Sequence, residues 1–381
     1  MRILIAAGGT GGHIYPALAV VTQLQNRQPD LELRWLGGHR GLEQDIVPAA
    51  GIRLDRLWLR SLRTVEASLN TVLDPLRLAA SVPQAIWKLM RWRPDVVYTT
   101  GGYVAIPVLA AAALLRIPSL LWEGNAIPGR SVRLSARLAS VRSVSFGVSS
   151  SRLPEPVFVT GTPIRGLRGV DGASGRARLD LSPDLPVMLI FGGSQAVKRL
   201  NEAVAEAIAD LVERCSVVHI TGDSGIAAAE TLRAGLPEAR RDRYRPYSFL
   251  LDDMDAALAA ADILVGRAGS SSLAESAAAG VPMIVVPYPH AAAHQRANAA
   301  EMVDAGAAEL VDDEDLDGDT LRAACDLLFD EERAAMSEAA RKVGRPGAAA
   351  ASALLLEALA ARGPLPSQAQ LDELTRGSGA S

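Results

Sequence analysis

The sequence predicts an α/β protein made of two similar halves, each a parallel sheet covered by helices. The first observation is the opening unit, in which an apolar strand at 2–7 leads into the glycine turn GGTGGH at 8–13 and a helix that ends before Pro29. The second is that strand, glycine turn and helix begin again at 187–212, after a Gly-, Ser-, Asp- and Pro-rich segment at 170–186 that we interpret as a linker or surface excursion. A second strand, glycine turn and helix in the same order, halfway along the chain, indicate two Rossmann-like sheets rather than one long sheet.

The composition bounds the class of protein before any motif is considered. A chain of 381 residues is long enough for two domains with separate cores, and 49% apolar with 22% charged residues is ordinary for a globular protein. The formal charge of −4 gives no reason to expect nucleic acid as a partner. Cys215 and Cys325 are too few and too far apart in the sequence for a disulfide framework or a zinc site.

The N-terminus and the apolar runs predict where the protein works. The chain starts directly on the 2–7 strand, so we expect no signal peptide. The longest apolar run, 104–115, contains Pro107 and is too short to span a bilayer. We therefore expect a cytosolic protein.

The other strands expected in the first half each end in glycines or asparagine. They cover 31–36, 95–99, 119–122 and 158–160, and the segments that follow them are Gly37-Gly38, Gly101-Gly102-Tyr103, 123–129 and 161–165. Open parallel sheets bind ligands at the carboxyl ends of their strands, so a ligand site is expected there. A nicotinamide dinucleotide is argued against, because the 8–13 glycines do not follow G-x-G-x-x-G and Gly37-Gly38 stand where an acidic residue would hold the ribose.

The stretch 263–298 has the densest pattern of candidate ligand-binding groups. A strand at 263–265 leads into a Gly/Ser turn and a helix carrying Glu275, and a second strand leads into a loop with Gln295 and Asn298. A helix start offers unpaired N–H groups to an anion, so phosphate, ribose and a polar sugar could be bound in that order. Ser272 and Glu275 are equally consistent with a capping box that serves only the helix.

Two further patterns could suggest a metal. His290 and His294 lie four residues apart, but no Glu stands between them and no third ligand has an obvious spacing, so a structural or substrate-side role is favoured over zinc. The acidic segment 312–319 resembles the first half of an EF-hand loop, but its twelfth position is Ala324, so we predict a solvated acidic loop before a helix. The sequence therefore predicts no metal site.

The motifs, taken in order, resemble the MurG family of N-acetylglucosaminyltransferases of peptidoglycan synthesis. Each motif alone is weak, but their order extends over most of the chain. They are GGTGGH (8–13), TGGY (100–103), EGNAIPG (123–129), GTPIR (161–165), GGSQ (192–195), DDM (252–254), GRAGSSSLAE (266–275), and Gln295 with Asn298.

The resemblance implies a GT-B fold, in which two Rossmann-like domains face a cleft, and an inverting, metal-independent reaction that uses no cofactor. It implies transfer of N-acetylglucosamine from UDP-N-acetylglucosamine to the C4 hydroxyl of undecaprenyl-pyrophosphoryl-N-acetylmuramoyl-pentapeptide, at the cytoplasmic face of the cell membrane. We expect an acceptor- and membrane-side domain at 1–164 and a UDP-sugar domain at 165–345. A C-terminal helix at 346–362 could return to the first domain, and 363–381 are expected to form a flexible tail.

The resemblance also assigns residues. The implied donor site comprises Thr10, Gly11, Gly12, Asn125, Arg165, Ser194, Leu251, Ser270, Ser271, Ser272, Leu273, Ala274, Glu275 and Gln295, and the implied acceptor side comprises Gly101, Gly102 and Tyr103. The family's H-E-Q-N reads Trp122-Glu123-Gly124-Asn125 here, which removes a histidine and an amide. GGSQGA reads GGSQAV at 192–197.

His13 is our candidate general base, because it ends the glycine turn and imidazole titrates near neutral pH. The alternative is that His13 only orients the turn. Two other functions stay open: another GT-B enzyme acting on UDP-sugars, such as a 2-epimerase or a natural-product glycosyltransferase, and a non-catalytic two-domain binding protein.

A basic segment indicates a membrane partner. Eight basic residues stand against three acidic ones between Arg53 and Arg93, a local charge of +5 (Arg53, Arg56, Arg60, Arg63, Arg77, Lys88, Arg91 and Arg93 against Asp55, Glu66 and Asp74). Aromatic and apolar residues are interleaved with them: Trp58, Leu59, Leu62, Trp87, Met90 and Trp92. We therefore predict binding to an anionic membrane surface. The alternative is that Ile86, Leu89 and Met90 are core and the arginines are merely solvated.

Overall fold

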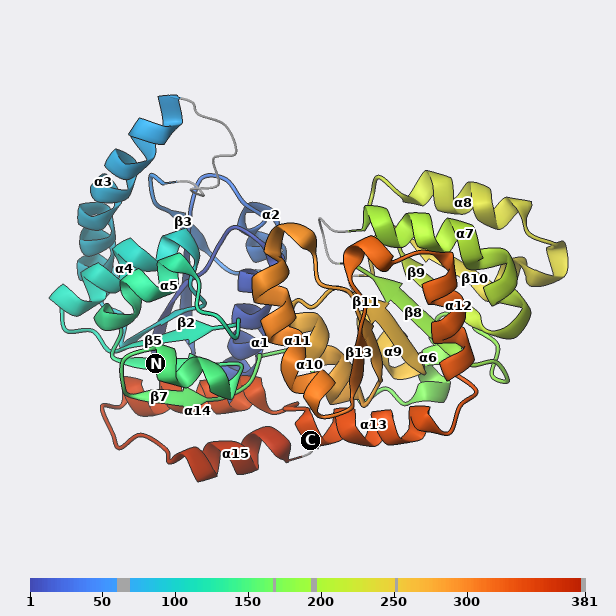
Figure 1. The fold of residues 1–381 in the computed structure, drawn as a ribbon. Coiled ribbons are helices and arrows are strands. Elements are labelled where there is room, and N and C mark those ends of the chain that lie inside the picture. Colours follow the sequence, from blue (N-terminus) through green and yellow to red (C-terminus); the bar gives the residue numbers. More distant parts are fainter. Residues whose placement is uncertain (60–68, 167–168, 193–196, 251–252, 378–381) are drawn as a thin grey trace. The chain divides into compact units, whose positions relative to one another are not determined.

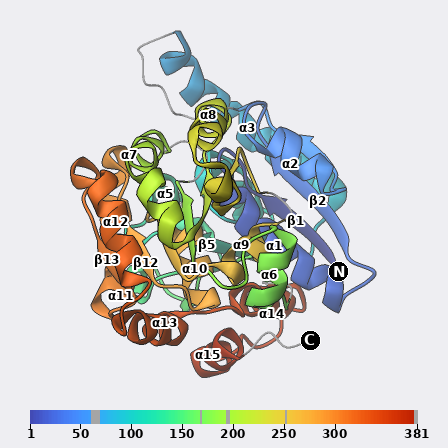
Figure 2. The same ribbon diagram turned by 90° about the vertical axis from the view of Figure 1, so that its right-hand side faces the viewer.

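The computed structural model describes residues 1–381 except 60–68, 167–168, 193–196, 251–252 and 378–381. The side chains of residues 69–75, 290 and 292 are also outside the description. The chain forms two compact units. Unit 1 consists of Met1–Arg165 and the described chain from Pro346 onward, and unit 2 consists of Gly166–Arg345. Each unit holds one parallel sheet, so the predicted class of two Rossmann-like parallel-sheet domains is confirmed (Figures 1 and 2).

The sheet of unit 1 has the described strands in the order β3-β2-β1-β4-β5-β6-β7, all paired in parallel. They are β1 (Arg2–Ala6), β2 (Glu32–Gly37), β3 (Leu54–Arg56), β4 (Val96–Thr99), β5 (Ser119–Glu123), β6 (Val141–Val144) and β7 (Val157–Val159). The strand order reverses between β1 and β4, and such a switch point opens a ligand crevice at the carboxyl ends of the strands. The GGTGGH and TGGY turns both begin there.

Helices cover both faces of this sheet. They are α1 (Gly11–Arg27), α2 (Glu43–Ala49), α3 (Leu69–Trp92), α4 (Gly102–Leu114), α5 (Arg130–Ser135) and α14 (Ala348–Ala360), with short 3₁₀ turns at Ala136–Leu138 and Gly147–Arg152. Successive strand residues point to opposite faces. Ile3 and Ile5 of β1 therefore pack with α1 and α14, while Leu4 and Ala6 pack with α3 and α4.

The sheet of unit 2 has the described strands in the order β10-β9-β8-β11-β12-β13, again all parallel. They are β8 (Val187–Phe191), β9 (Ser216–Ile220), β10 (Tyr244–Tyr247), β11 (Ile263–Gly266), β12 (Met283–Val285) and β13 (Ala308–Leu310). The helices are α6 (Gly172–Arg178), α7 (Lys198–Arg214), α8 (Ile226–Gly235), α9 (Met254–Ala260), α10 (Ser270–Ala279), α11 (Ala292–Asp304), α12 (Gly318–Leu327) and α13 (Glu332–Val343), with 3₁₀ turns at Glu238–Arg243, Pro289–Ala291 and Asp313–Asp315.

The segment 170–186, interpreted from its composition as a linker, contains helix α6. The side chain of Asp171 caps it by accepting a hydrogen bond from Ser174 N at 2.7 Å. Gly175 packs so closely on α9 that an added Cβ would lie 2.5 Å from the carbonyl oxygen of Ala256. Small residues on two facing helices thus hold the segment against unit 2.

The C-terminal residues also differ from the prediction. The flexible tail expected at 363–381 contains helix α15 (Gln368–Arg376), which begins with a capping box between Ser367 and Gln370. Leu371 is fully buried in the core of unit 1. Gln368 accepts from Val159 N and donates to Val159 O, both at 2.9 Å, so its amide pairs with edge strand β7 as another strand would.

Cys215 and Cys325, far apart in the sequence, meet in the core of unit 2. Helices α7 and α12 pack together, and their two buried sulfur atoms lie 3.8 Å apart as thiols. Within the described residues, no helix is both long and apolar enough to cross a membrane.

Candidate functional site

The glycine turn after β1 brings His13 to the switch point of unit 1. Gly9 has φ +100°, and Thr10 is the N-cap residue of α1, so the first N–H groups of the helix have no acceptor one turn earlier. His13 Nδ1 lies 2.7 Å from the carbonyl oxygen of Thr100, and Thr100 Oγ1 donates to the His13 carbonyl at 2.8 Å. Because a carbonyl oxygen only accepts, Nδ1 carries a proton and Nε2 is the nitrogen that exchanges one.

The TGGY turn packs against the His13 ring. Gly101 and Gly102 have φ values of +87° and +74°, which residues other than glycine rarely adopt. A Cβ on Gly102 would lie 3.3 Å from Gly8 O and 3.6 Å from His13 Cδ2, and one on Gly101 would lie 2.9 Å from Val132 Cγ2. The two glycines therefore let the backbone lie close to the imidazole.

Glu123 organises the loop that carries Asn125. Its carboxylate is buried and accepts from Asn125 N at 2.8 Å, from Asn125 Nδ2 at 3.0 Å and from Gly129 N at 2.9 Å. Trp122, which replaces the family's histidine, is buried and donates from Nε1 to the Gly161 carbonyl at 3.1 Å. This substitution therefore ties the 123–129 loop to the GTPIR segment.

Arg165 ends unit 1 next to the start of α1. Its guanidinium carbon lies 4.4 Å from the centroid of the Tyr15 ring, one turn along α1 from Gly11. Stacking on a ring face holds a guanidinium in place without removing its charge. A cation thus lies near the N-terminal end of α1.

In unit 2, the GRAGSSSLAE motif forms the turn after β11 and the start of α10. Gly269 is the N-cap residue, so Ser270, Ser271 and Ser272 make up the first helical turn and Glu275 follows in the next. A capping box pairs the side chain of the N-cap residue with that of the third helical residue, and here those positions are Gly269 and Ser272, not Ser272 and Glu275. The capping-box interpretation of Ser272 and Glu275 is therefore wrong. Leu273 is buried, while Ala274 and Glu275 are half-buried.

Gln295 and Asn298 lie on α11 and hold neighbouring loops. Gln295 Oε1 accepts from Tyr288 N at 2.8 Å, in the loop after β12. Asn298 is buried and donates from Nδ2 to the Ala268 carbonyl at 3.2 Å, just before α10. Ser194 and Leu251 lie outside the described residues, as does the side chain of His290, while His294 is exposed.

Two buried charges near these turns were not among the site residues predicted from the sequence. Arg267, at the end of β11, is 4% exposed and pairs with Asp313 at 2.5 Å, with the Tyr288 ring 5.6 Å from its guanidinium. Glu43, at the start of α2, is 0% exposed and contacts the glycine turn. Nothing local in the sequence relates Arg267 to the distant Asp313, and Glu43 is a single acidic residue in a Gly-rich segment.

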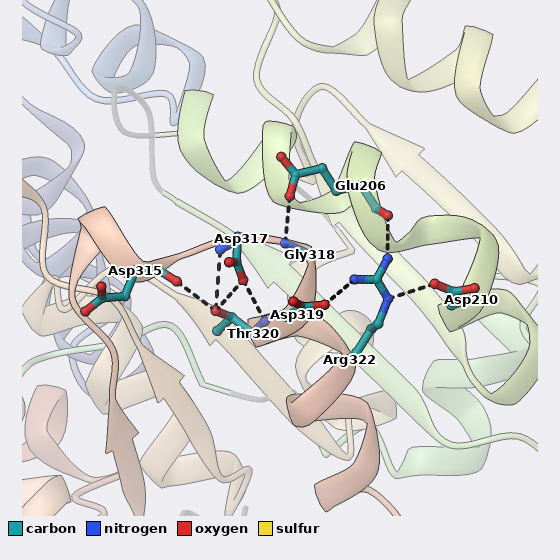
Figure 3. A network of polar contacts seen from close by, with 8 residues as sticks. All are labelled: Glu206, Asp210, Asp315, Asp317, Gly318, Asp319, Thr320 and Arg322. Atoms are coloured by element: carbon teal, nitrogen blue, oxygen red, sulfur yellow. Dashed lines mark hydrogen bonds and ion pairs between the residues drawn. The ribbon is translucent and has the colours of Figure 1, made fainter.

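The acidic segment 312–319 makes polar contacts at the start of α12 (Figure 3). Asp317 and Thr320 form a capping box at the start of α12, and Glu206 accepts from Gly318 N at 2.9 Å. Arg322 links Asp319 and Asp210 through ion pairs of 2.6 and 2.7 Å. The prediction of a solvated acidic loop before a helix is therefore confirmed, since Glu314, Asp315, Asp317 and Asp319 are exposed and α12 follows. Among the residues described, no cluster of three or more His, Cys, Asp or Glu could hold a metal ion.

The family models account for most of the chain. The glycosyltransferase family 28 N-terminal domain matches residues 3–141, and the glycosyltransferase family 28 C-terminal domain matches residues 187–353. The chain is 38% identical over 362 residues to the UDP-N-acetylglucosamine--N-acetylmuramyl-(pentapeptide) pyrophosphoryl-undecaprenol N-acetylglucosamine transferase of Moorella thermoacetica, covering 91% of this chain and 96% of that protein.

Solved structures agree in fold. The crystal structure of Acinetobacter baumannii MurG superposes with a TM-score of 0.73 at 29% identity, over 93% of this chain and 99% of that one. A UDP-N-acetylglucosamine 2-epimerase from Listeria monocytogenes, described as putative, superposes with a TM-score of 0.68 over 96% and 98% of the two chains. Its identity is only 16%, so this likeness shows the fold alone.

Proposed function

Because this chain belongs to glycosyltransferase family 28, we propose that it transfers N-acetylglucosamine from UDP-N-acetylglucosamine to the C4 hydroxyl of undecaprenyl-pyrophosphoryl-N-acetylmuramoyl-pentapeptide. The Moorella thermoacetica relative is named for this donor sugar and this acceptor. The observation that carries the proposal is the hydrogen bond of His13 at the switch point of unit 1. There the Thr100 carbonyl fixes Nδ1 as a donor. In a histidine held in this way, Nε2 is the nitrogen that would take the proton of a sugar hydroxyl.

The reaction is proposed as a single displacement. The acceptor hydroxyl oxygen bonds to the anomeric carbon while the bond from that carbon to the UDP oxygen breaks, and the hydroxyl proton passes to His13 Nε2. General-base assistance of this kind contributes about 10²–10⁴-fold. The Gly101-Gly102-Tyr103 turn, which lies against the imidazole, is proposed to border the acceptor side.

The donor is proposed to bind through helix starts and a few polar side chains. The N–H groups of Ser270, Ser271 and Ser272 at the start of α10 suit the diphosphate, because a helix N-terminus carries positive potential. Glu275 would accept from the ribose hydroxyls, and Gln295 would contact the sugar.

Unit 1 is proposed to supply the remaining donor contacts. Thr10, Gly11 and Gly12 form the start of α1, Asn125 is oriented by Glu123, and Arg165 stacks on Tyr15. These groups would stabilise the charge on the departing diphosphate. The metal-independent course that the family resemblance implies is retained in the proposal.

A comparison of acceptors tests this function. Purified protein is mixed with UDP-N-acetylglucosamine alone, with a short-chain lipid-linked muramoyl-pentapeptide, and with a soluble sugar or natural-product alcohol, and UDP release is followed. The proposal predicts fast release only with the muramoyl acceptor. Conversion of the UDP-sugar without acceptor would indicate a 2-epimerase, and transfer to the unrelated alcohol would indicate another glycosyltransferase. Binding without turnover in every mixture would indicate the non-catalytic alternative.

We further propose that unit 1 binds the anionic cytoplasmic face of the membrane as a peripheral protein. Seven residues of α3 and of the segment after β3 form what we call the membrane patch: Trp58, Leu76, Arg77, Trp87, Lys88, Met90 and Arg91. Leu76 and Trp87 lie eleven residues apart, about three helical turns, and so share one side of α3. Arg77 lies 6.0 Å from the Trp58 ring and Arg91 lies 5.9 Å from the Trp87 ring.

Burial separates this patch from the core. Leu89 is buried and Ile86 packs against the core of unit 1, as the core interpretation expected, whereas Trp87 is 61% and Met90 57% exposed. Trp92 is half-buried under Arg34. Exposed tryptophans beside cations are typical of surfaces that enter a lipid headgroup region. Arg60, Leu62 and Arg63 of the predicted segment lie outside the described residues.

A further inference from the structure

One fully buried carboxylate has no part in the reaction proposed above. Glu43 is the first residue of α2 and is 0% exposed. Its Oε2 accepts from Gly9 N at 2.8 Å, and its Oε1 accepts from Gly38 N at 3.1 Å and from the Tyr103 hydroxyl at 2.8 Å. A buried carboxylate is costly unless hydrogen bonds compensate it, so this arrangement is built rather than incidental.

Three glycines make room for this side chain. A Cβ on Gly8 would lie 2.7 Å from Glu43 Oε1, one on Gly37 would lie 2.8 Å from Glu43 Cγ, and one on Gly41 would lie 2.1 Å from Glu43 Oε2. Non-bonded carbon and oxygen atoms do not approach so closely. Any larger residue at these positions would displace the carboxylate, so the glycines around Glu43 form a cradle that fits it.

The carboxylate joins the two segments that hold His13. Gly9 lies in the turn that carries His13. Tyr103 is the second residue of α4, directly after Gly101 and Gly102, whose backbone lies against the imidazole. Burial, and to a lesser extent the charge of Glu43, raises the pKa of Tyr103, so its hydroxyl keeps its proton. The hydroxyl donates this proton to Glu43 and to the Arg40 carbonyl. Without the carboxylate, the turn and the helix start would lose their common acceptor.

We infer that Glu43 is a positioning residue, which sets the orientation of the His13 imidazole by fixing the glycine turn and the TGGY turn relative to each other. This inference rests on the proposed function, because only there does the direction of Nε2 matter. Glu43 is fully buried and is not among the residues proposed to contact either substrate. A displacement of about 1 Å in a catalytic group can lower turnover by about 10²-fold.

The test uses Glu43→Gln in the full-length protein. Glutamine keeps the shape of the side chain but replaces one acceptor oxygen by an NH₂ donor, which faces another N–H or the tyrosine hydroxyl. We expect kcat with the lipid-linked acceptor to fall by about 10²-fold. UDP binding, measured by calorimetry, should fall by a much smaller factor than kcat, because most of the proposed donor contacts lie outside the glycine turn and a loss mainly in kcat is the mark of a misplaced catalytic group.

A matched control separates positioning from packing. Val47 lies on the same helix and is fully buried, so Val47→Ala loosens α2 and lowers Tm while leaving the carboxylate in place. At a temperature where both variants are folded, Val47→Ala should keep wild-type kcat. Equal losses in the two variants, or a wild-type kcat in Glu43→Gln, would overturn the inference.

Nitrogen-15 NMR of the His13 ring tests the inference without any turnover. The chain has five histidines, so loss of one signal in His13→Ala assigns it. In the wild type and in Val47→Ala we expect the Nδ1–H form, and in Glu43→Gln a mixture of tautomers. An unchanged ring signal in Glu43→Gln contradicts the inference, whereas an inactive wild type contradicts only the proposed function. If Glu43→Gln does not fold, Tyr103→Phe takes its place, because it removes the hydroxyl that donates to Glu43. The His13 ring signal should then also show a mixture of tautomers, and an unchanged signal would contradict the inference.

Discussion

Neutralising the membrane patch should weaken vesicle binding by an amount that the structure allows to be calculated. The change is Arg77→Gln, Lys88→Gln and Arg91→Gln together. Each basic group close to an anionic surface contributes about 1 kcal/mol, so the three together contribute about 3 kcal/mol, or about 150-fold in the partition coefficient. Arg77 lies near the Trp58 ring and Arg91 near the Trp87 ring.

The assay is sedimentation with vesicles that contain either neutral lipid or a mixture with anionic lipid. The wild-type protein should bind the anionic vesicles at low salt and be released as the salt rises, because 1 M salt shortens the Debye length to about 3 Å. The control neutralises three exposed cations of unit 2 instead (Arg214, Arg322 and Lys342). It has the same net charge as the patch variant and should bind like the wild type.

Two results would refute this reasoning. The first is equal loss of binding in the patch variant and in the unit 2 control, which would mean that net charge alone matters. The second is equal binding to neutral and anionic vesicles. Transfer to a water-soluble acceptor should be unaffected by the patch variant, since the patch is proposed to contact lipid only.

The remaining predictions concern the reaction and the fold. Glu275→Ala should raise the donor KM by about 10- to 150-fold, since a hydrogen bond to a charged group contributes about 1.5–3 kcal/mol; an unchanged KM would remove Glu275 from the donor site. His13→Ala should lower kcat by about 10²–10⁴-fold while UDP still binds, and wild-type turnover would exclude it as the base. EDTA should leave activity unchanged, and inhibition reversed by Mg²⁺ would contradict the metal-independent course. Leu371→Ala should cost about 2–5 kcal/mol in urea unfolding, whereas no loss would mean that α15 is not docked in solution.

The sequence predicts the fold and the turns well because both depend on local patterns. Apolar strands followed by glycine turns place His13 and Ser270 in the first turns of helices. Both helices begin earlier than predicted, α1 at Gly11 inside the 8–13 turn and α10 at Ser270 inside the Gly/Ser turn. The repeat of that order at β8 is likewise local. Such signals need no knowledge of which segments meet in space.

The features that the sequence does not predict depend on tertiary contacts. Glu43 is an acidic residue in a polar stretch, and only the approach of Gly9 and Tyr103, 34 and 60 residues away, makes it a buried acceptor. Arg267 meets Asp313 in the same manner. The segment that forms helix α15 is predicted as a flexible tail because its apolar residues are few, yet Leu371 packs in the core of unit 1.

The Ser272 and Glu275 pattern shows why a short motif can mislead. Four letters fit a capping box, but the helix starts at Ser270, three residues too early for Ser272 to be the N-cap. The first helical residue is set by where β11 ends and by Gly269, and neither is part of the four-letter motif. A motif of this length therefore needs its helix boundary before it can be interpreted.

The most direct test of the proposed function is the structure of the reaction product. Protein, UDP-N-acetylglucosamine and a short-chain lipid-linked muramoyl-pentapeptide are incubated, and the lipid product is analysed by mass spectrometry and proton NMR. We expect one added N-acetylhexosamine on the C4 oxygen of the muramoyl sugar, with the β coupling that inversion of the α-linked donor requires. An α-linked product, a sugar attached elsewhere, or an epimerised UDP-sugar with the lipid unchanged would contradict the proposed function.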